Sequence, residues 1–168
     1  MNLDELKTLQ APIKDRYKVS PEASLVRLRA EANGVEGIAC KIDTHKGLVE
    51  AGLHPATGGD GLQACSGDML LEALAACAGV TLQAVTTAFG VNLSRSKVIA
   101  EGTLDFRGTL GISKVAPVGF KDISLRFDIA GDVSEETMAK IIQTTEKYCV
   151  VLQTLRAPPE VHTPVSTV

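Results

Sequence analysis

Hydrophobic and polar residues alternate over several short stretches of the chain, which is the pattern of β-strands that bury one face. Strands are expected at residues 26–31, 38–43, 48–53, 98–106 and 122–129, with a last one at 160–163. Asn33-Gly34 follows the first stretch and is a favoured hairpin turn, so the first two strands are predicted to pair antiparallel. The glycine-rich residues 54–65 are expected to form a loop.

Two longer stretches repeat their apolar residues every three or four positions, as amphipathic helices do. The first helix is predicted to start after Ser66 as N-cap and to end at Gly90. The second is predicted to start near Asp132 or Ser134 and to end before Pro158. Their apolar stripes are Leu71, Leu74, Ala75, Ala78, Leu82, Val85 and Phe89, and Met138, Ile141, Ile142, Thr145, Cys149 and Leu152.

Three leucines at intervals of three residues predict a short helix before Pro12, within an arm formed by residues 1–20. We expect this arm to pack on the domain or on a second subunit. The whole order is three strands, helix, two strands, helix, strand, which predicts an α+β fold with mostly antiparallel sheets and two core helices. Because the chain has 168 residues, no repeat and no long linker, it is expected to form one domain over residues 1–168.

The amino-acid composition argues against several classes of function. The 17 basic and 20 acidic residues give a net charge of −3 without a basic cluster, so nucleic-acid binding is not expected. No stretch reaches the ~20 uninterrupted apolar residues of a membrane-spanning helix. The polar N-terminus does not resemble an export signal. We therefore expect a cytoplasmic protein with no nucleic-acid or membrane partner, whose cysteines are thiols.

Two of the four cysteines lie on the two predicted core helices, Cys77 within an alanine run and Cys149 on an apolar face. If the helices pack at the usual separation of ~8–10 Å, the sulfurs can meet. One thiolate could then attack a peroxide, and the other thiol could close a disulfide on the resulting sulfenic acid. Spacing alone fits two small buried hydrophobes better. Cys65 is either a thiol activated by helix amides or a loop residue without a special role, and Cys40 is expected in the core.

No cofactor or metal is expected from the other motifs. His45, His54 and His162 are too scattered to form a metal site. The loop at residues 58–61 lacks the Lys and Ser/Thr of a phosphate-binding loop. Ser66 is not within the G-x-S-x-G motif of a hydrolase nucleophile.

Four segments together resemble the OsmC/Ohr superfamily of thiol-dependent peroxide-detoxifying proteins: CSGDMLLEALAACAGVTLQAV, GTLDFRG, GFKDISLRFDIAGD and EKYCVVLQTL. The similarity covers roughly residues 48–163, and its specific part is the order and separation of the two cysteine-bearing helices. It implies an OsmC-like fold in an intertwined homodimer, with active sites near the subunit interface. It also implies that Cys77 is the peroxidatic and Cys149 the resolving cysteine of an antioxidant stress-response enzyme. Such enzymes reduce organic hydroperoxides, are recycled by dithiols such as lipoyl groups, and need no metal or cofactor.

The chain departs from the best-characterised branches of that superfamily near the expected active site. Those branches place a glutamate ten residues before the peroxidatic cysteine, where this chain has Gly67, with Asp68 next. They also use an arginine of the N-terminal strands to stabilise the thiolate, for which Arg27 and Arg29 are the candidates. Asp68 either holds that arginine or is a charge that favours the helix N-terminus. The two arginines either act on Cys77 or are solvated.

A further departure is Val150, which replaces the proline that usually follows the second cysteine. Two classes of function therefore stay open. The first is a hydroperoxide reductase that uses Cys77 and Cys149. The second is a non-catalytic ligand-binding or redox-sensing dimer of the same fold. The apolar helix around Cys77 favours an organic peroxide over a highly charged one.

Overall fold

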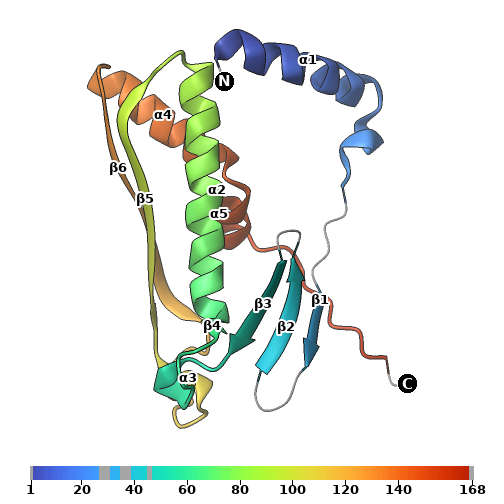
Figure 1. Ribbon diagram of the computed structural model, residues 1–168, viewed down its shortest axis with the longest axis vertical. Coiled ribbons are helices and arrows are strands. Elements are labelled where there is room, and N and C mark those ends of the chain that lie inside the picture. Colours follow the sequence, from blue (N-terminus) through green and yellow to red (C-terminus); the bar gives the residue numbers. More distant parts are fainter. Residues whose placement is uncertain (1, 27–30, 35–38, 45–46, 167–168) are drawn as a thin grey trace.

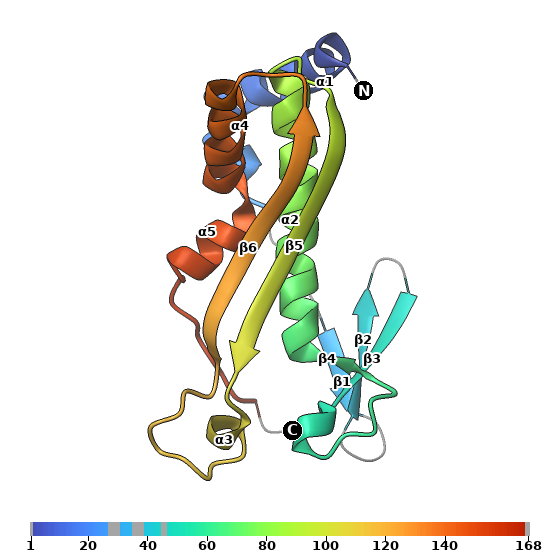
Figure 2. The ribbon, with the colours of Figure 1, turned by 90° about the vertical axis from the view of Figure 1, so that its left-hand side faces the viewer.

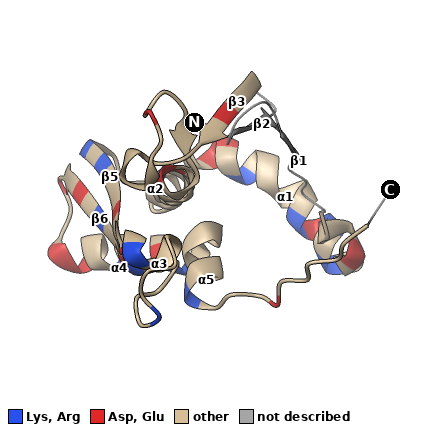
Figure 3. Ribbon diagram, turned by 90° about the horizontal axis from the view of Figure 1, so that it is seen from below, with Lys and Arg blue, Asp and Glu red and all other residues tan. Residues whose placement is uncertain are grey.

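The long helix α2 (Ser66–Ala88) is the axis of the molecule (Figure 1). The structure is a computed structural model that describes residues 2–26, 31–34, 39–44 and 47–166. The charged residues of α2, Asp68 and Glu72, lie near its start, whereas charges of both signs are mixed along the peripheral helices (Figure 3). An apolar helix of this kind has to be covered by the rest of the protein.

Two long strands and two short helices cover α2. The antiparallel ribbon of β5 (Leu93–Leu104) and β6 (Phe120–Gly131) runs along it, and α4 (Glu135–Tyr148) and α5 (Val150–Arg156) pack beside it. Figure 2 shows the ribbon in front of α2, with α4 and α5 on one side and the smaller sheet on the other. The fold is thus α+β, as predicted.

The smaller sheet has four strands in the order β1-β2-β3-β4. They are β1 (Glu31–Gly34), β2 (Ala39–Thr44), β3 (Gly47–Gly52) and β4 (Ala64–Cys65). The first three pair antiparallel, as expected, and β4 pairs parallel with β3. The expected turn at Asn33-Gly34 is wrong, because these residues belong to β1 and pair with Lys41 and Cys40.

Two other strand predictions are wrong, those that include Phe106 and residues 160–163. Phe106 begins a short helix, α3 (Phe106–Thr109), because Asp105 caps it by accepting hydrogen bonds from the backbone N–H and the guanidinium of Arg107. The loop after β3 contains a 3-10 turn, η2 (Pro55–Thr57). Residues 160–163 follow Pro158-Pro159 and pair with no described strand.

The N-terminal arm is one helix, α1 (Leu3–Val19), followed by the 3-10 turn η1 (Pro21–Ser24). The helix is longer than predicted, because it continues through Pro12. It starts with a capping box, in which the Asn2 side chain accepts from the Glu5 N–H and the Asn2 N–H donates to the Glu5 carboxylate, each at 2.9 Å. None of its residues is buried, and it touches α2.

Two clusters of buried side chains join α2 to the helices beside it. One contains Leu74, Ala78, Cys149 and Leu152, and the other contains Leu82, Val85 and Ile141. The stripe predicted for α2 is therefore confirmed in its middle, while Phe89 at its end is 44% exposed. The first cluster is the one that holds both helix cysteines, because Cys77 packs against it.

By length and composition alone, α2 could cross a membrane. In this fold it is the central helix, and its buried stripe packs on β5, α4 and α5. Its other side carries Leu70 and Val80, which are 37% and 73% exposed in the single chain. Of these two, Leu70 lines a pocket with residues of the loop after β3 and of β5, whereas Val80 is largely exposed.

Candidate functional site

Cys77 and Cys149 lie together at the centre of the molecule. Cys77 is in the middle of α2 and half-buried, whereas Cys149 is fully buried between α4 and α5. Their side chains hydrogen-bond to each other, and both are free thiols. Residues 72 positions apart in the sequence are thus in contact, as the packing of two core helices predicted.

Cys149 is not on a continuous helix, contrary to the prediction. It has non-helical angles, φ −72° and ψ 104°, and it both ends α4 and begins α5. Its N–H donates to the Thr145 carbonyl, and its own carbonyl accepts from the Gln153 N–H, each at 2.9 Å. The β-branched pair Val150-Val151 has low helix propensity at this point. Because the chain turns here, the first amides of α5 point at the sulfur of Cys77.

Hydrogen bonds to its sulfur set the ionisation of Cys77. Burial raises the pKa of this thiol. The Val151 N–H, the Cys149 thiol, the Val150 N–H and the Thr81 hydroxyl lower the pKa as hydrogen-bond donors near the sulfur. The hydrogen bonds together outweigh the effect of burial. The pKa of Cys77 is therefore below that of an ordinary thiol, and the thiolate is favoured.

The second thiol is shifted the other way. Burial raises the pKa of Cys149, and the neighbouring Cys77 raises it further, although the amides of Leu152 and Val151 partly offset this. Cys149 therefore keeps its proton and donates it in a hydrogen bond to Cys77. Cys77 is thus the preferred nucleophile and Cys149 the preferred proton donor. Reduction of a peroxide by two thiols needs these two different roles.

These opposite shifts predict different pH profiles of alkylation. Iodoacetamide reacts with accessible thiolates, so Cys77 should be modified in the native protein and should lose reactivity as pH falls through its lowered pKa, whereas the fully buried Cys149 should stay unmodified. A pH series with peptide mass spectrometry measures both profiles. In urea-unfolded protein the two profiles should coincide, because the burial and hydrogen bonds are gone. Coincident profiles in the native protein would contradict this assignment.

The structure does not bring Asp68 to the two cysteines. Asp68 is exposed in the first turn of α2, beside Leu71 and the strand β5. It precedes Cys77 by nine helical residues, a rise of about 13 Å. Its position fits a charge that favours the helix N-terminus. Arg27 and Arg29 lie outside the described residues.

Cys65 belongs to a separate pocket. It is the N-cap of α2, one residue earlier than the sequence predicted, and it is half-buried. Together with His54 and Phe106, whose rings stack 4.9 Å apart, it lines a pocket of about 380 Å³. A side chain at Gly67 would also enter this pocket, since a Cβ there would lie 3.6 Å from the Cys65 sulfur. Position 67, where the best-characterised branches have a glutamate, thus faces Cys65 rather than Cys77.

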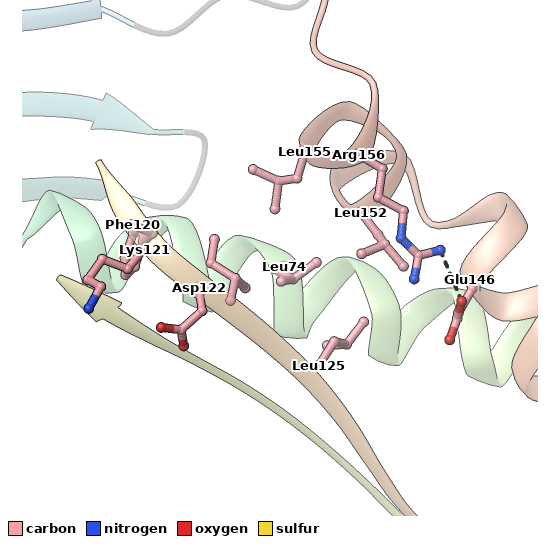
Figure 4. Close-up of a pocket in the computed structure, with 10 residues that line it drawn as sticks. Leu74, Phe120, Lys121, Asp122, Leu125, Glu146, Leu152, Leu155 and Arg156 are labelled. Carbon is pink, nitrogen blue, oxygen red and sulfur yellow. Dashed lines mark hydrogen bonds and ion pairs between the residues drawn. The ribbon is translucent and has the colours of Figure 1, made fainter. Parts of the chain in front are cut away.

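A second pocket shares Leu74 and Leu152 with the buried cluster that contains Cys149 (Figure 4). It has a volume of about 370 Å³, and its apolar wall includes Leu74, one turn before Cys77, and Leu152, one turn after Cys149. Its rim is charged, with Lys121 and the ion pair between Arg156 Nη1 and Glu146 Oε2 at 3.0 Å. An apolar molecule with one polar end fits this lining.

Residues 59–163, more than half of the chain, match the family model for OsmC-like proteins. The protein belongs to the OsmC-like family. The resemblance seen in the sequence is therefore confirmed. No curated protein matches the sequence at a significant level.

Solved structures share the fold of this OsmC-like protein. An OsmC-like protein from Mycoplasma pneumoniae has a TM-score of 0.65 and 19% identity, over 79% of this chain and 89% of that one. An organic hydroperoxide resistance protein from Elizabethkingia anophelis has a TM-score of 0.63 and 18% identity, over 80% and 91%. A protein of the same description from Legionella pneumophila has a TM-score of 0.60 and 19% identity, over 80% and 92%. At these identities the likeness is one of fold.

The sequence analysis missed three donors to the sulfur of Cys77. They are the hydroxyl of Thr81 and the amides of Val150 and Val151. The sequence pointed to a cation near the thiol, whereas these groups are neutral. Two signals were present: a threonine four residues after Cys77, on the same helix face, and a residue with an N–H in place of the usual proline.

Proposed function

We propose that this OsmC-like protein reduces organic hydroperoxides, with Cys77 as the peroxidatic and Cys149 as the resolving cysteine. The observation that carries the proposal is the hydrogen-bonded thiol pair, in which Cys77 has the lowered and Cys149 the raised pKa. Two of the structures with this fold are described as organic hydroperoxide resistance proteins, which supports the same chemistry.

The reaction has three balanced steps. The Cys77 thiolate attacks the terminal oxygen of the hydroperoxide, the O–O bond breaks, and the alkoxide takes a proton to leave as an alcohol. Cys77 is then a sulfenic acid. Cys149 loses its proton and attacks the Cys77 sulfur, which forms the disulfide and releases water. An external dithiol, for which a lipoyl-type group is our candidate, reduces the disulfide and is itself oxidised to a disulfide.

Neutral donors replace a cation in the described part of this site. The groups that hydrogen-bond to the Cys77 sulfur there are two amides, one thiol and one hydroxyl. Such donors stabilise a thiolate as amides stabilise an oxyanion. Arg27 and Arg29 stay candidates for an additional cation, and Asp68 stays a candidate to orient it once a second chain is present. No metal or bound cofactor enters the mechanism.

We also propose that the partner of this chain is a second copy. Val80, one helical turn after the half-buried Cys77 on α2, is 73% exposed in the single chain. Covering it would bury apolar surface and exclude water from the thiol. A cytoplasmic location, with no nucleic-acid or membrane partner, is part of the same proposal.

Mass spectrometry of the native protein tests the function. We expect a Cys77–Cys149 disulfide after one equivalent of cumene hydroperoxide without reductant, because the two side chains are already in contact. The Cys149→Ser variant should instead stop at a Cys77 sulfenic acid, which dimedone labels. Unmodified thiols in both proteins would reject the proposal. They would favour the alternative, a non-catalytic ligand-binding dimer of this fold.

A further inference from the structure

The short helix α5 covers the buried Cys149 with few side chains. Its inward side contributes the buried Leu152 and the half-buried Val151 and Leu155 to the cluster that contains Cys149. Residues 157–166, which follow the helix, are all exposed and form no helix or strand. The place of α5 therefore depends on its packing against this cluster and on the contacts that tie it to α4.

The described backbone hydrogen bonds do not run continuously from α4 into α5. Those of α4 end at the Cys149 N–H, which donates to the Thr145 carbonyl. Those of α5 begin at the Cys149 carbonyl, which accepts from the Gln153 N–H. A single residue with non-helical angles can serve as a hinge, because a change in its torsions reorients the helix that follows. Cys149 is thus both the hinge of α5 and the thiol that α5 helps to cover.

Two side-chain hydrogen bonds tie α5 to α4 across this hinge. Arg156 Nη1, at the end of α5, donates to Glu146 Oε2 at 3.0 Å (Figure 4). Gln153 Nε2 donates to the Glu146 backbone carbonyl at 2.8 Å. In an uninterrupted helix that carbonyl would accept from the N–H of residue 150. Both ties therefore end on Glu146, and they replace backbone bonds that the hinge has removed.

We propose that Arg156 is a positioning residue for Cys149: its ion pair with Glu146 clasps α5 to α4, and release of this pair lets α5 turn about Cys149 and bring that thiol to solvent. The clasp keeps the buried thiol available to Cys77 and out of reach of external reagents. The two side chains are 53% and 37% exposed, so salt weakens the pair. The inference goes beyond the proposed function, since it describes the reduced protein whether or not a peroxide is the substrate.

Slow alkylation of Cys149 measures how often α5 opens. Cys149 has no exposed surface, so iodoacetamide reaches it only in molecules that have opened. All variants are made in the full-length chain with Cys77→Ser as a common background, so that alkylation at position 77 does not push the helices apart. Peptide mass spectrometry follows Cys149 over hours at one pH. Arg156→Gln and Glu146→Gln should each raise the rate about two- to fivefold, as expected for the loss of one partly exposed ion pair.

A double variant and a salt series identify the ion pair as the cause. E146Q/R156Q should react no faster than the faster single variant, because either substitution already breaks the pair. Raising NaCl from about 0.05 M to about 0.5 M should accelerate the background protein and leave R156Q unchanged, since only the background protein has this pair to screen. The salt series needs no substitution in the clasp, so it decides the inference even if a variant does not fold.

Lys140→Gln is the matched control. Lys140 Nζ lies 2.6 Å from Glu136 Oε1, and this exposed ion pair lies wholly within α4 and does not cross the hinge. K140Q removes one positive charge, as R156Q does, but should leave the rate of Cys149 alkylation unchanged. Denaturant titration of each variant separates opening of α5 from global unfolding, because only global unfolding changes the rate in step with the free energy of unfolding.

Each outcome decides the inference. An unchanged rate in R156Q would overturn it, and so would an equal rise in K140Q, which would indicate a general effect of charge. Additive effects of E146Q and R156Q would also overturn it, because the two residues would then act separately. The assay contains no peroxide. If R156Q exposes Cys149 while the natural sequence consumes no hydroperoxide, the clasp is supported and the proposed function alone is wrong.

Discussion

Replacing Cys77 with serine is expected to lower the rate of organic hydroperoxide consumption at least about a hundredfold. A serine hydroxyl is not ionised at neutral pH, and its oxygen cannot accept the peroxide oxygen as a sulfenic acid does. The four hydrogen bonds that favour the thiolate would have no anion to stabilise. Peroxide loss with excess dithiol, followed by a colorimetric hydroperoxide assay, measures this effect.

Cys65→Ser is the control for that experiment. Cys65 is also a half-buried free thiol, at the N-cap of α2, but it lines the pocket shared with His54 and Phe106. Its replacement should leave the rate within about twofold, as expected for a residue outside the reacting pair. If C77S consumed hydroperoxide at the parental rate, the proposed function would be excluded.

Truncating Leu82 to alanine is expected to lower the free energy of unfolding by about 2–5 kcal/mol. Leu82 is fully buried in the cluster that joins α2 to Ile141 of α4, so its loss leaves a cavity between the two helices. Denaturant titration at one fixed protein concentration measures the change. The site cysteines lie in the other cluster, so the alkylation rate of Cys77 in the folded variant should be retained.

Leu62→Ala is the matched control for this truncation. Leu62 is 87% exposed in the loop before α2. The same chemical change there should alter the free energy of unfolding by less than about 0.5 kcal/mol. Equal effects at Leu62 and Leu82 would show that α2 is not packed against α4 as described.

Periodicity predicted the parts of the fold in which a single stretch of sequence determines the structure. The stripe of α2 and the alternation of β6 identify their buried faces directly. The parallel pairing of β4 with β3 involves two residues, too few for any pattern. The alternating run that ends at Phe106 was misleading, because the Asp105 side chain caps a helical turn instead.

The sequence predicted the two cysteines of the candidate site but not the groups that surround their sulfur atoms. Cys77 and Cys149 stand on apolar helix faces, so packing brings them together. The donors depend on three-dimensional detail: the amide of Val151 reaches Cys77 only because the helix is interrupted at Cys149. No interruption was foreseen, since neither glycine nor proline stands there.

The interruption at Cys149 would also ease the proposed closure of the Cys77–Cys149 disulfide. Cys149 is the single non-helical residue between α4 and α5, so its own backbone torsions can absorb the movement that closes an S–S bond. Neither helix then has to unwind when the sulfur approaches Cys77. A protein that is oxidised and reduced at every turnover would thereby keep its helical content constant, and the dithiol would meet the same folded surface each time.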